Sequence, residues 1–404
     1  MLAALLIMLA GPQIWSSRWS SGLLAVTHLL TLGYMSMVML GAMLQMLPVL
    51  AGAPVPKVVL TGGLVHFFTL TGSLLLAAGF VWAEQTLLLT AAAMLTLGYG
   101  LFVSMTMFAL YRKGAGNPTI QGMRVALMGL LLVVGLGLLL TLGFTGRLVL
   151  PSIHLWTNVH LSWGIAGWFA VLLISVSYQV VPMFQVTPEY PKWMRRWLLP
   201  LLLITLAIWS LLSLKGASLV LETMMLGLLL LELTLFAATT LWLFSKRKRK
   251  VPDNTVLFWR IGISLFGLVM LLLILGKYLP AVQLELILGV LIVQGILLTM
   301  INGMLYRIVP FLSWFHLQHL QLSEGRFDMK LPHMKSFITD QAVRRQFYVH
   351  LASLFCMLGA VYYPQLMTYP AAILFFLSNL LLLWNLGMSW SRHNGIRKEI
   401  LGEG

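Results

Sequence analysis

Histidine is the residue of this sequence best suited to chemistry inside a membrane, because its ring nitrogens bind haem iron and copper. His28 lies near the start of one apolar run, and His154 and His160 lie near the start of another. An imidazole on a membrane helix is costly unless it faces the protein interior. We therefore expect His28 and His160 to bind a cofactor or metal. His154 is a weaker candidate metal ligand, because its position predicts a place at the membrane surface.

Three carboxylates also fall within or near apolar runs, and they are candidates for a proton route or for metal ligation. Glu222 and Glu285 lie close to the ends of their runs, where water would solvate them. Glu232 lies nearer the middle of its run and is the better candidate.

A glycine and a proline recur at one fixed spacing in three apolar segments. The glycine stands fifteen residues before the proline in each, in the pairs Gly33 and Pro48, Gly167 and Pro182, and Gly295 and Pro310. The prolines are 134 and 128 residues apart, which leaves room for about four membrane helices in each interval. The spacing predicts an internal repeat of four-helix sets. The repeats run roughly over 1–56, 57–195 and 196–325, with 326–404 closing the fold.

The composition is that of a polytopic membrane protein. Hydrophobic residues make up 60% of the 404 residues, charged residues only 9%, and the mean hydropathy is +0.93. The net charge of +15 comes from Lys and Arg in short loops between apolar runs, so we expect a lipid bilayer and no nucleic acid as partner. The single cysteine excludes a disulfide framework and a thiolate metal cluster.

Apolar runs predict twelve membrane helices and no strands. They cover 2–15, 22–50, 57–83, 86–111, 121–144, 153–184, 197–214, 217–245, 256–278, 282–312, 344–364 and 369–389. Basic residues cluster in the loops after the even-numbered spans, including the run from Lys246 to Lys250. The positive-inside rule then predicts that both termini face the cytoplasm.

The topology and the two helical histidines resemble subunit I of the haem-copper oxidase superfamily, including its nitric-oxide-reductase branch. The likeness covers twelve helices in three four-helix sets with pseudo-threefold symmetry, in which helices 2, 6 and 10 are equivalent. The segment from Asn158 to Trp168 looks like helix 6 of shorter relatives in that group. The resemblance implies a bacterial inner-membrane location.

The resemblance assigns roles to two residues and leaves other roles unfilled. His28 matches the family's low-spin haem ligand on helix 2, and His160 matches the helix 6 ligand of copper or non-haem metal. The family's helix 10 carries two histidines, whereas 282–312 has none. The family's adjacent histidine pair on helix 7 is absent from 197–214.

Because these imidazoles are missing, a binuclear oxidase centre cannot be built as the family builds it. We expect one haem b held by His28 with His160 as its partner, and copper is less expected. The chain would then act in electron transfer, in haem handling or with respiratory subunits. Any enzyme activity would be oxidoreductase chemistry of the oxidase or reductase type. The alternatives are a twelve-helix transporter, whose usual two-half design fits the repeat period poorly, and a metal-free assembly partner of a respiratory complex.

Overall fold

The computed structural model describes residues 1–113, 117–248, 253–278 and 280–403. Within these ranges every regular element is helical and no strand occurs, as the sequence predicted. Helices follow the apolar runs because backbone polar groups in lipid must be satisfied inside the segment itself. Ten helices in the described ranges are long and apolar enough to cross a membrane. The protein is therefore an all-α, multi-pass membrane protein.

Each predicted span coincides with a helix, but two of the twelve do not meet the criteria of length and apolarity. The first, Leu2–Ser16, is a short apolar helix. The other is Asp340–Tyr362, which is long enough but carries polar and basic side chains such as Arg344 and Arg345. Arg249 and Lys250, counted above among the basic loop residues, lie outside the described residues.

The chain divides into two compact units, which are described separately. Unit 1 comprises Met1–Leu30 and Pro252–Gly404. Its helices are α1 (Leu2–Ala10), η1 (Gly11–Ser16), α2 (Ser21–Leu30), α11 (Asn254–Leu275), η4 (Gly276–Tyr278), α12 (Ala281–Val290), η5 (Leu291–Leu298), α13 (Thr299–Ser323), η6 (Met334–Ser336), α14 (Asp340–Tyr362) and α15 (Pro364–Leu401).

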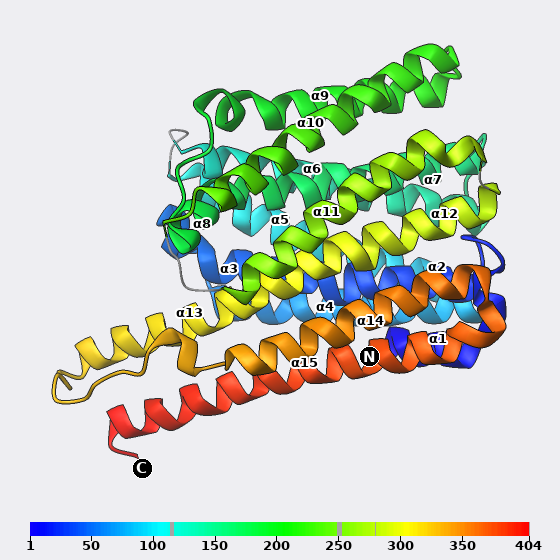
Figure 1. Ribbon diagram of the computed structural model, residues 1–404. Coiled ribbons are helices and arrows are strands. Elements are labelled where there is room, and N and C mark those ends of the chain that lie inside the picture. Colours follow the sequence, from blue (N-terminus) through cyan, green and yellow to red (C-terminus); the bar gives the residue numbers. More distant parts are fainter. Residues whose placement is uncertain (114–116, 249–252, 279, 404) are drawn as a thin grey trace. The chain divides into compact units, whose positions relative to one another are not determined.

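Within unit 1, the first and last segments of the chain pack together. Helices α14 and α15 run antiparallel, side by side, and α1 packs against α15 and α2 (Figure 1). The indole nitrogen of Trp15 donates a 2.9 Å hydrogen bond to the hydroxyl of Thr368, so a buried polar pair joins η1 to α15.

Unit 2 comprises Thr31–Val251. Its helices are η2 (Thr31–Ser36), α3 (Met37–Ala51), α4 (Val58–Trp82), α5 (Gln85–Tyr111), α6 (Pro118–Phe144), α7 (Ile153–Ser162), η3 (Trp163–Ala170), α8 (Val171–Gln185), α9 (Lys192–Lys215) and α10 (Leu219–Ser245). Helix α6 packs against α5, α8 and η3, and α9 packs against α10. The Trp163 indole donates a 3.1 Å hydrogen bond to Ser210, which ties η3 to α9.

Three long helices change from α to π geometry at the repeated glycine. Gly33 lies in η2, Gly167 in η3 and Gly295 in η5, and all three elements are π-helical. A π segment widens the helix and interrupts the regular backbone hydrogen bonds, and such segments are frequent at functional sites. The glycine spacing read from the sequence thus coincides with a shared backbone feature.

The prolines that anchor the repeat do not end their helices. Pro48, Pro182 and Pro310 all lie inside a helix. Helix α13 continues beyond Pro310 to Ser323, which corrects the predicted end of the span near residue 312.

The extension of α13 is held by an apolar cluster. Leu317 of α13, Phe337 of the following segment and Ile400 of α15 are each at most 2% exposed and pack together. Figure 1 shows the ends of α13 and α15 projecting beyond the start of α14. This packing explains why the helix continues where sequence hydropathy falls.

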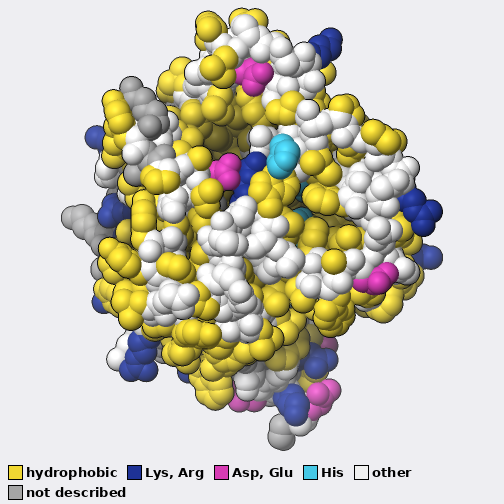
Figure 2. Space-filling view, turned by 90° about the vertical axis from the view of Figure 1, so that its right-hand side faces the viewer, with side chains coloured by type: hydrophobic (Ala, Val, Ile, Leu, Met, Phe, Trp, Pro, Cys, Tyr) yellow, Lys and Arg dark blue, Asp and Glu magenta, His cyan; other side chains and the backbone are white. Residues whose placement is uncertain are grey.

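The surface is that of a lipid-facing protein. Large apolar side chains such as Leu9, Val59 and Val149 are more than 80% exposed. Figure 2 looks onto helix ends, and there too hydrophobic side chains are numerous and charged side chains are scattered. A soluble protein rarely exposes such contiguous apolar area.

Close backbone contact between α6 and η3 depends on two glycines. A Cβ atom added at Gly129 would lie 2.0 Å from the carbonyl oxygen of Gly167, a distance that requires backbone movement. Gly135, on the same helix α6, has no heavy atom within 4 Å of such a Cβ position.

We predict that Gly129→Ala destabilises unit 2 by about 1–3 kcal/mol of unfolding free energy, because overpacking forces the two helices apart. Gly135→Ala is the matched control and should be neutral or slightly stabilising, because alanine favours helix. Unfolding of the purified protein in mixed detergent micelles measures both. Equal stability of the two variants would contradict the packing described for Gly129.

Candidate functional site

His28, the predicted haem ligand, lies half-buried in α2 of unit 1. Its Nδ1 is 2.8 Å from the carbonyl oxygen of Leu24, one turn earlier on the same helix. A carbonyl only accepts, so Nδ1 carries the proton and Nε2 carries the lone pair. Metal-binding histidines commonly anchor the second ring nitrogen in this way. The tautomer therefore suits ligation through Nε2.

His160, the second predicted ligand, lies half-buried near the end of α7 in unit 2, directly before the π segment η3. Its ring lies against α6, where a Cβ atom at Gly137 would be 3.3 Å from its Cε1 atom. Glycine at 137 therefore leaves space for the imidazole. The geometry of His160 is described within unit 2, and that of His28 within unit 1.

His154, the weaker candidate, lies exposed in the first turn of α7. In the described part of the chain, no three His, Cys, Asp or Glu side chains are grouped as a protein-only metal site needs. The structure thus places His154 and His160 on the same helix without a third such ligand.

Glu232 is the predicted proton-route residue that is buried. It is 5% exposed on α10, and its Oε1 accepts a 3.0 Å hydrogen bond from the hydroxyl of Thr205 on α9. Its Oε2 has no hydrogen-bond partner. A buried carboxyl group with a single hydrogen-bond donor in a membrane helix is a candidate for binding and releasing a proton.

The other two carboxylates lie at helix ends. Glu222 lies half-buried in the first turn of α10, where the helix dipole stabilises a negative charge. Glu285 lies exposed on α12, and its Oε2 is 3.4 Å from Nε of Arg18 in unit 1. An exposed ion pair of this kind contributes little stability.

A buried polar cluster in unit 1 was not singled out by the sequence. His350 of α14 is 1% exposed, and its Nε2 lies 2.8 Å from the hydroxyl of Thr299 on α13. Nearby, Gln294 of η5 donates a 2.7 Å hydrogen bond to Ser353 of α14. The sequence does contain a sign of this cluster, because His350 and Ser353 are polar residues three positions apart in an apolar helix. Their partners, however, are known only from packing.

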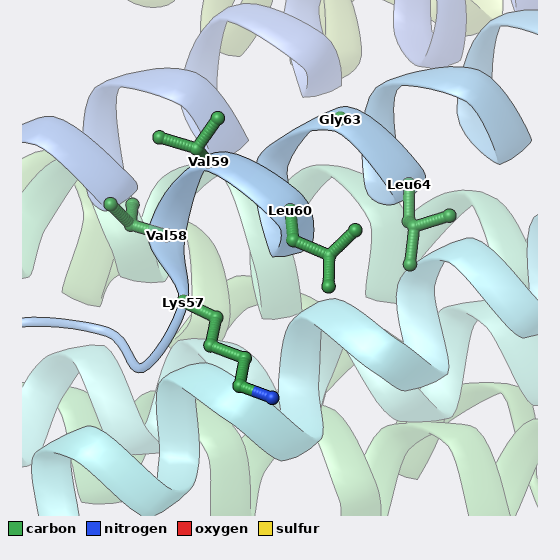
Figure 3. Close-up of a pocket in the computed structure, with 6 residues that line it drawn as sticks. All are labelled: Lys57, Val58, Val59, Leu60, Gly63 and Leu64. Carbon is green, nitrogen blue, oxygen red and sulfur yellow. The ribbon is translucent and has the colours of Figure 1, made fainter.

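A surface hollow lies at the start of α4. It is lined by Lys57, Val58, Val59, Leu60, Gly63 and Leu64. Figure 3 shows the aliphatic side chains along the first turns of the helix, with the Lys57 side chain extending to the same side as Leu60 and Leu64. One charged group among apolar side chains offers no catalytic constellation.

Comparison with known proteins gives no relative. No protein-family model matches the sequence, and no curated protein matches it.

We predict that Thr205→Val destabilises the α9–α10 pair by about 1–3 kcal/mol, because Glu232 loses its hydrogen-bond donor while it stays buried. Thr234→Val is the matched control on α10, since the exposed hydroxyl of Thr234 bonds only the Leu230 carbonyl of its own helix. Unfolding in mixed detergent micelles measures the difference. A similar loss of unfolding free energy in both variants would show that the bond from Thr205 to Glu232 adds no more stability than a bond within one helix.

Proposed function

We propose that this protein is an inner-membrane haem protein that transfers electrons, in which His28 would bind the haem iron. The observation that carries the proposal is the Nδ1 bond of His28 to Leu24, which fixes the tautomer that ligation through Nε2 needs. When bound, haem b supplies one-electron redox chemistry between ferric and ferrous iron. His28 would hold and orient the group, and the surrounding apolar side chains would exclude water from it.

His160 is assigned to haem or metal binding on the same chemical grounds. It lies three residues before the first residue of a π segment, an element that is frequent at functional sites, and Gly137 leaves room for its ring. The assignment of both histidines derives from the resemblance to oxidase subunit I. The three glycine-centred π segments support the equivalence of helices 2, 6 and 10 that this resemblance implies.

Electron transfer is favoured over reduction of oxygen or nitric oxide. An open-coordinated haem that faces a second metal requires further imidazoles, and residues 197–214 and 282–312 contain none. The distribution of loop charge supports cytoplasmic termini in a bacterial inner membrane. Electron donors and acceptors would then be other cytochromes or respiratory subunits.

We predict that His28→Phe lowers the haem content at least about tenfold, because loss of a direct ligand costs more than loss of an outer-shell partner. Each variant is purified in mild detergent from cells supplied with haem, and haem per chain is measured by the pyridine haemochrome method. His160→Phe is tested in parallel, and it lowers the haem or metal content if its assignment holds.

His66→Phe is the matched control, because His66 is exposed on the membrane helix α4. It should keep the haem content of the unmodified protein. A folded His28→Phe protein with full haem content would overturn the assignment. Protein without haem in any preparation would leave the transporter or the metal-free assembly partner as the function.

A further inference from the structure

Helix α14 carries a row of fully buried polar side chains on one face. Gln346, His350 and Ser353 are each at most 1% exposed. Positions four and three residues apart lie above one another on a helix, so the three side chains form one stripe along α14. At 1.5 Å per residue, the stripe extends for about 10 Å, roughly a third of the hydrocarbon thickness.

The polar stripe is bonded to two neighbouring helices of unit 1. Gln346 Nε2 donates a 3.0 Å hydrogen bond to Ser378 of α15. Ser353 receives the amide of Gln294 from η5, at 2.7 Å. The stripe therefore ends beside the π segment that contains Gly295.

The protonation of His350 follows from its neighbours. The hydroxyl of Thr299 donates to the carbonyl oxygen of Gln294 at 3.0 Å, so the Thr299 oxygen accepts from Nε2–H of His350. In the neutral ring, the lone pair is then on Nδ1. This atom is buried and has no hydrogen-bond partner.

A second unpartnered atom lies one helical turn away. Oε1 of Gln346 is a buried acceptor with no hydrogen-bond donor. Leaving a polar atom buried and unbonded costs about 1–3 kcal/mol, so two such atoms on one face call for an explanation. A proton on Nδ1 of His350 would provide a donor on the face where Gln346 Oε1 lacks one.

Polar groups continue from the stripe to the start of α14. Asn385 of α15 donates to the Tyr306 hydroxyl at 2.9 Å and to the Ala342 carbonyl at 3.3 Å. At the helix start, Asn254 accepts from Nε of Arg344 at 3.1 Å and donates to the Asp340 carboxylate at 2.9 Å. These groups come from α15, α13 and α11 and lie beside the first turns of α14, where Asp340 and Arg344 carry charge.

No carboxylate competes with His350 for the proton within the stripe, among the residues that the structure describes. The carboxylates of unit 1 that form ion pairs do so near helix ends, in the pairs Glu285 with Arg18, Asp253 with Arg307, Asp328 with Arg326 and Asp340 with Lys335. The other described carboxylates of this unit, Glu324, Glu399 and Glu403, are exposed beyond α13 and at the end of the chain. Apart from His350, the titratable member among the buried polar groups named here is Tyr306.

We propose that this polar stripe is a proton path into unit 1 from the side where α14 begins, and that His350 is its proton-binding group. A proton from water forms a bond to Nδ1 of His350, and the ring becomes an imidazolium. Nε2–H remains bonded to Thr299, and the new Nδ1–H bond adds a donor to the face of α14 that carries the unbonded Gln346 Oε1. Release breaks the same Nδ1–H bond, and no electron is transferred. The proposal does not depend on haem.

The test is deuterium exchange at the Cε1–H of histidine, read by mass spectrometry on the full chain in lipid nanodiscs. This exchange requires both protonation of the ring and access of water. We expect the exchange rate of His350 to be within about tenfold of that of the exposed His333. A buried histidine without access to water would exchange only during rare local opening, and therefore much more slowly. Exchange at His350 that is about a hundredfold or more slower in the unmodified protein would overturn the proposal.

The variant Gln346→Leu removes the acceptor from the stripe and should slow exchange at His350 by about tenfold or more. Gln341→Leu is the matched control, because Gln341 is exposed in the first turn of α14, and it should leave the rate unchanged. A folded Gln346→Leu protein with an unchanged rate at His350 would overturn the proposed path. If that variant does not fold, the rate in the unmodified protein decides the question.

Discussion

The structure depends on one constraint: polar groups inside a bilayer must find their partners within the protein. The backbone meets this constraint by forming helices throughout the described ranges. Side chains meet it through cross-helix bonds, such as Trp163 to Ser210 in unit 2 and Asn385 to Tyr306 in unit 1. Nδ1 of His350 and Oε2 of Glu232 are buried atoms without a hydrogen-bond partner, and they are exceptions to this constraint.

Small residues and π segments set how closely these helices approach. Gly129 leaves space for the carbonyl of Gly167, and Gly137 leaves space for the ring of His160, so α6 packs tightly against the next long helix. Lipid gives no hydrophobic force between helices, and close van der Waals contact at small residues replaces it. A π segment recurs at Gly33, Gly167 and Gly295. Two of these segments lie in the same long helices as His28 and His160, the residues for which a function is proposed.

Much of the fold could be predicted because apolar length is a local property, and most helix bounds agree within a few residues. Tertiary partners are not local. The guanidinium of Arg307, for example, pairs with Asp253 at 3.6 Å within unit 1, a partner 54 positions away in the sequence. Helix α13 ends at Ser323 because apolar contacts with α15 hold its last turns. The predicted span ended near residue 312, just after Pro310, because these contacts are not visible in the sequence. His28 could be found from its residue type and depth, whereas His350 needed the positions of Thr299 and Gln346.

The central claim is that His28 holds a redox-active haem, and a reduced-minus-oxidised visible spectrum of the detergent-purified protein tests it most directly. The account predicts Soret and alpha bands of a b-type haem that appear on reduction, at about one haem per chain. A colourless protein, made with ample haem supply and shown to be folded, would contradict it.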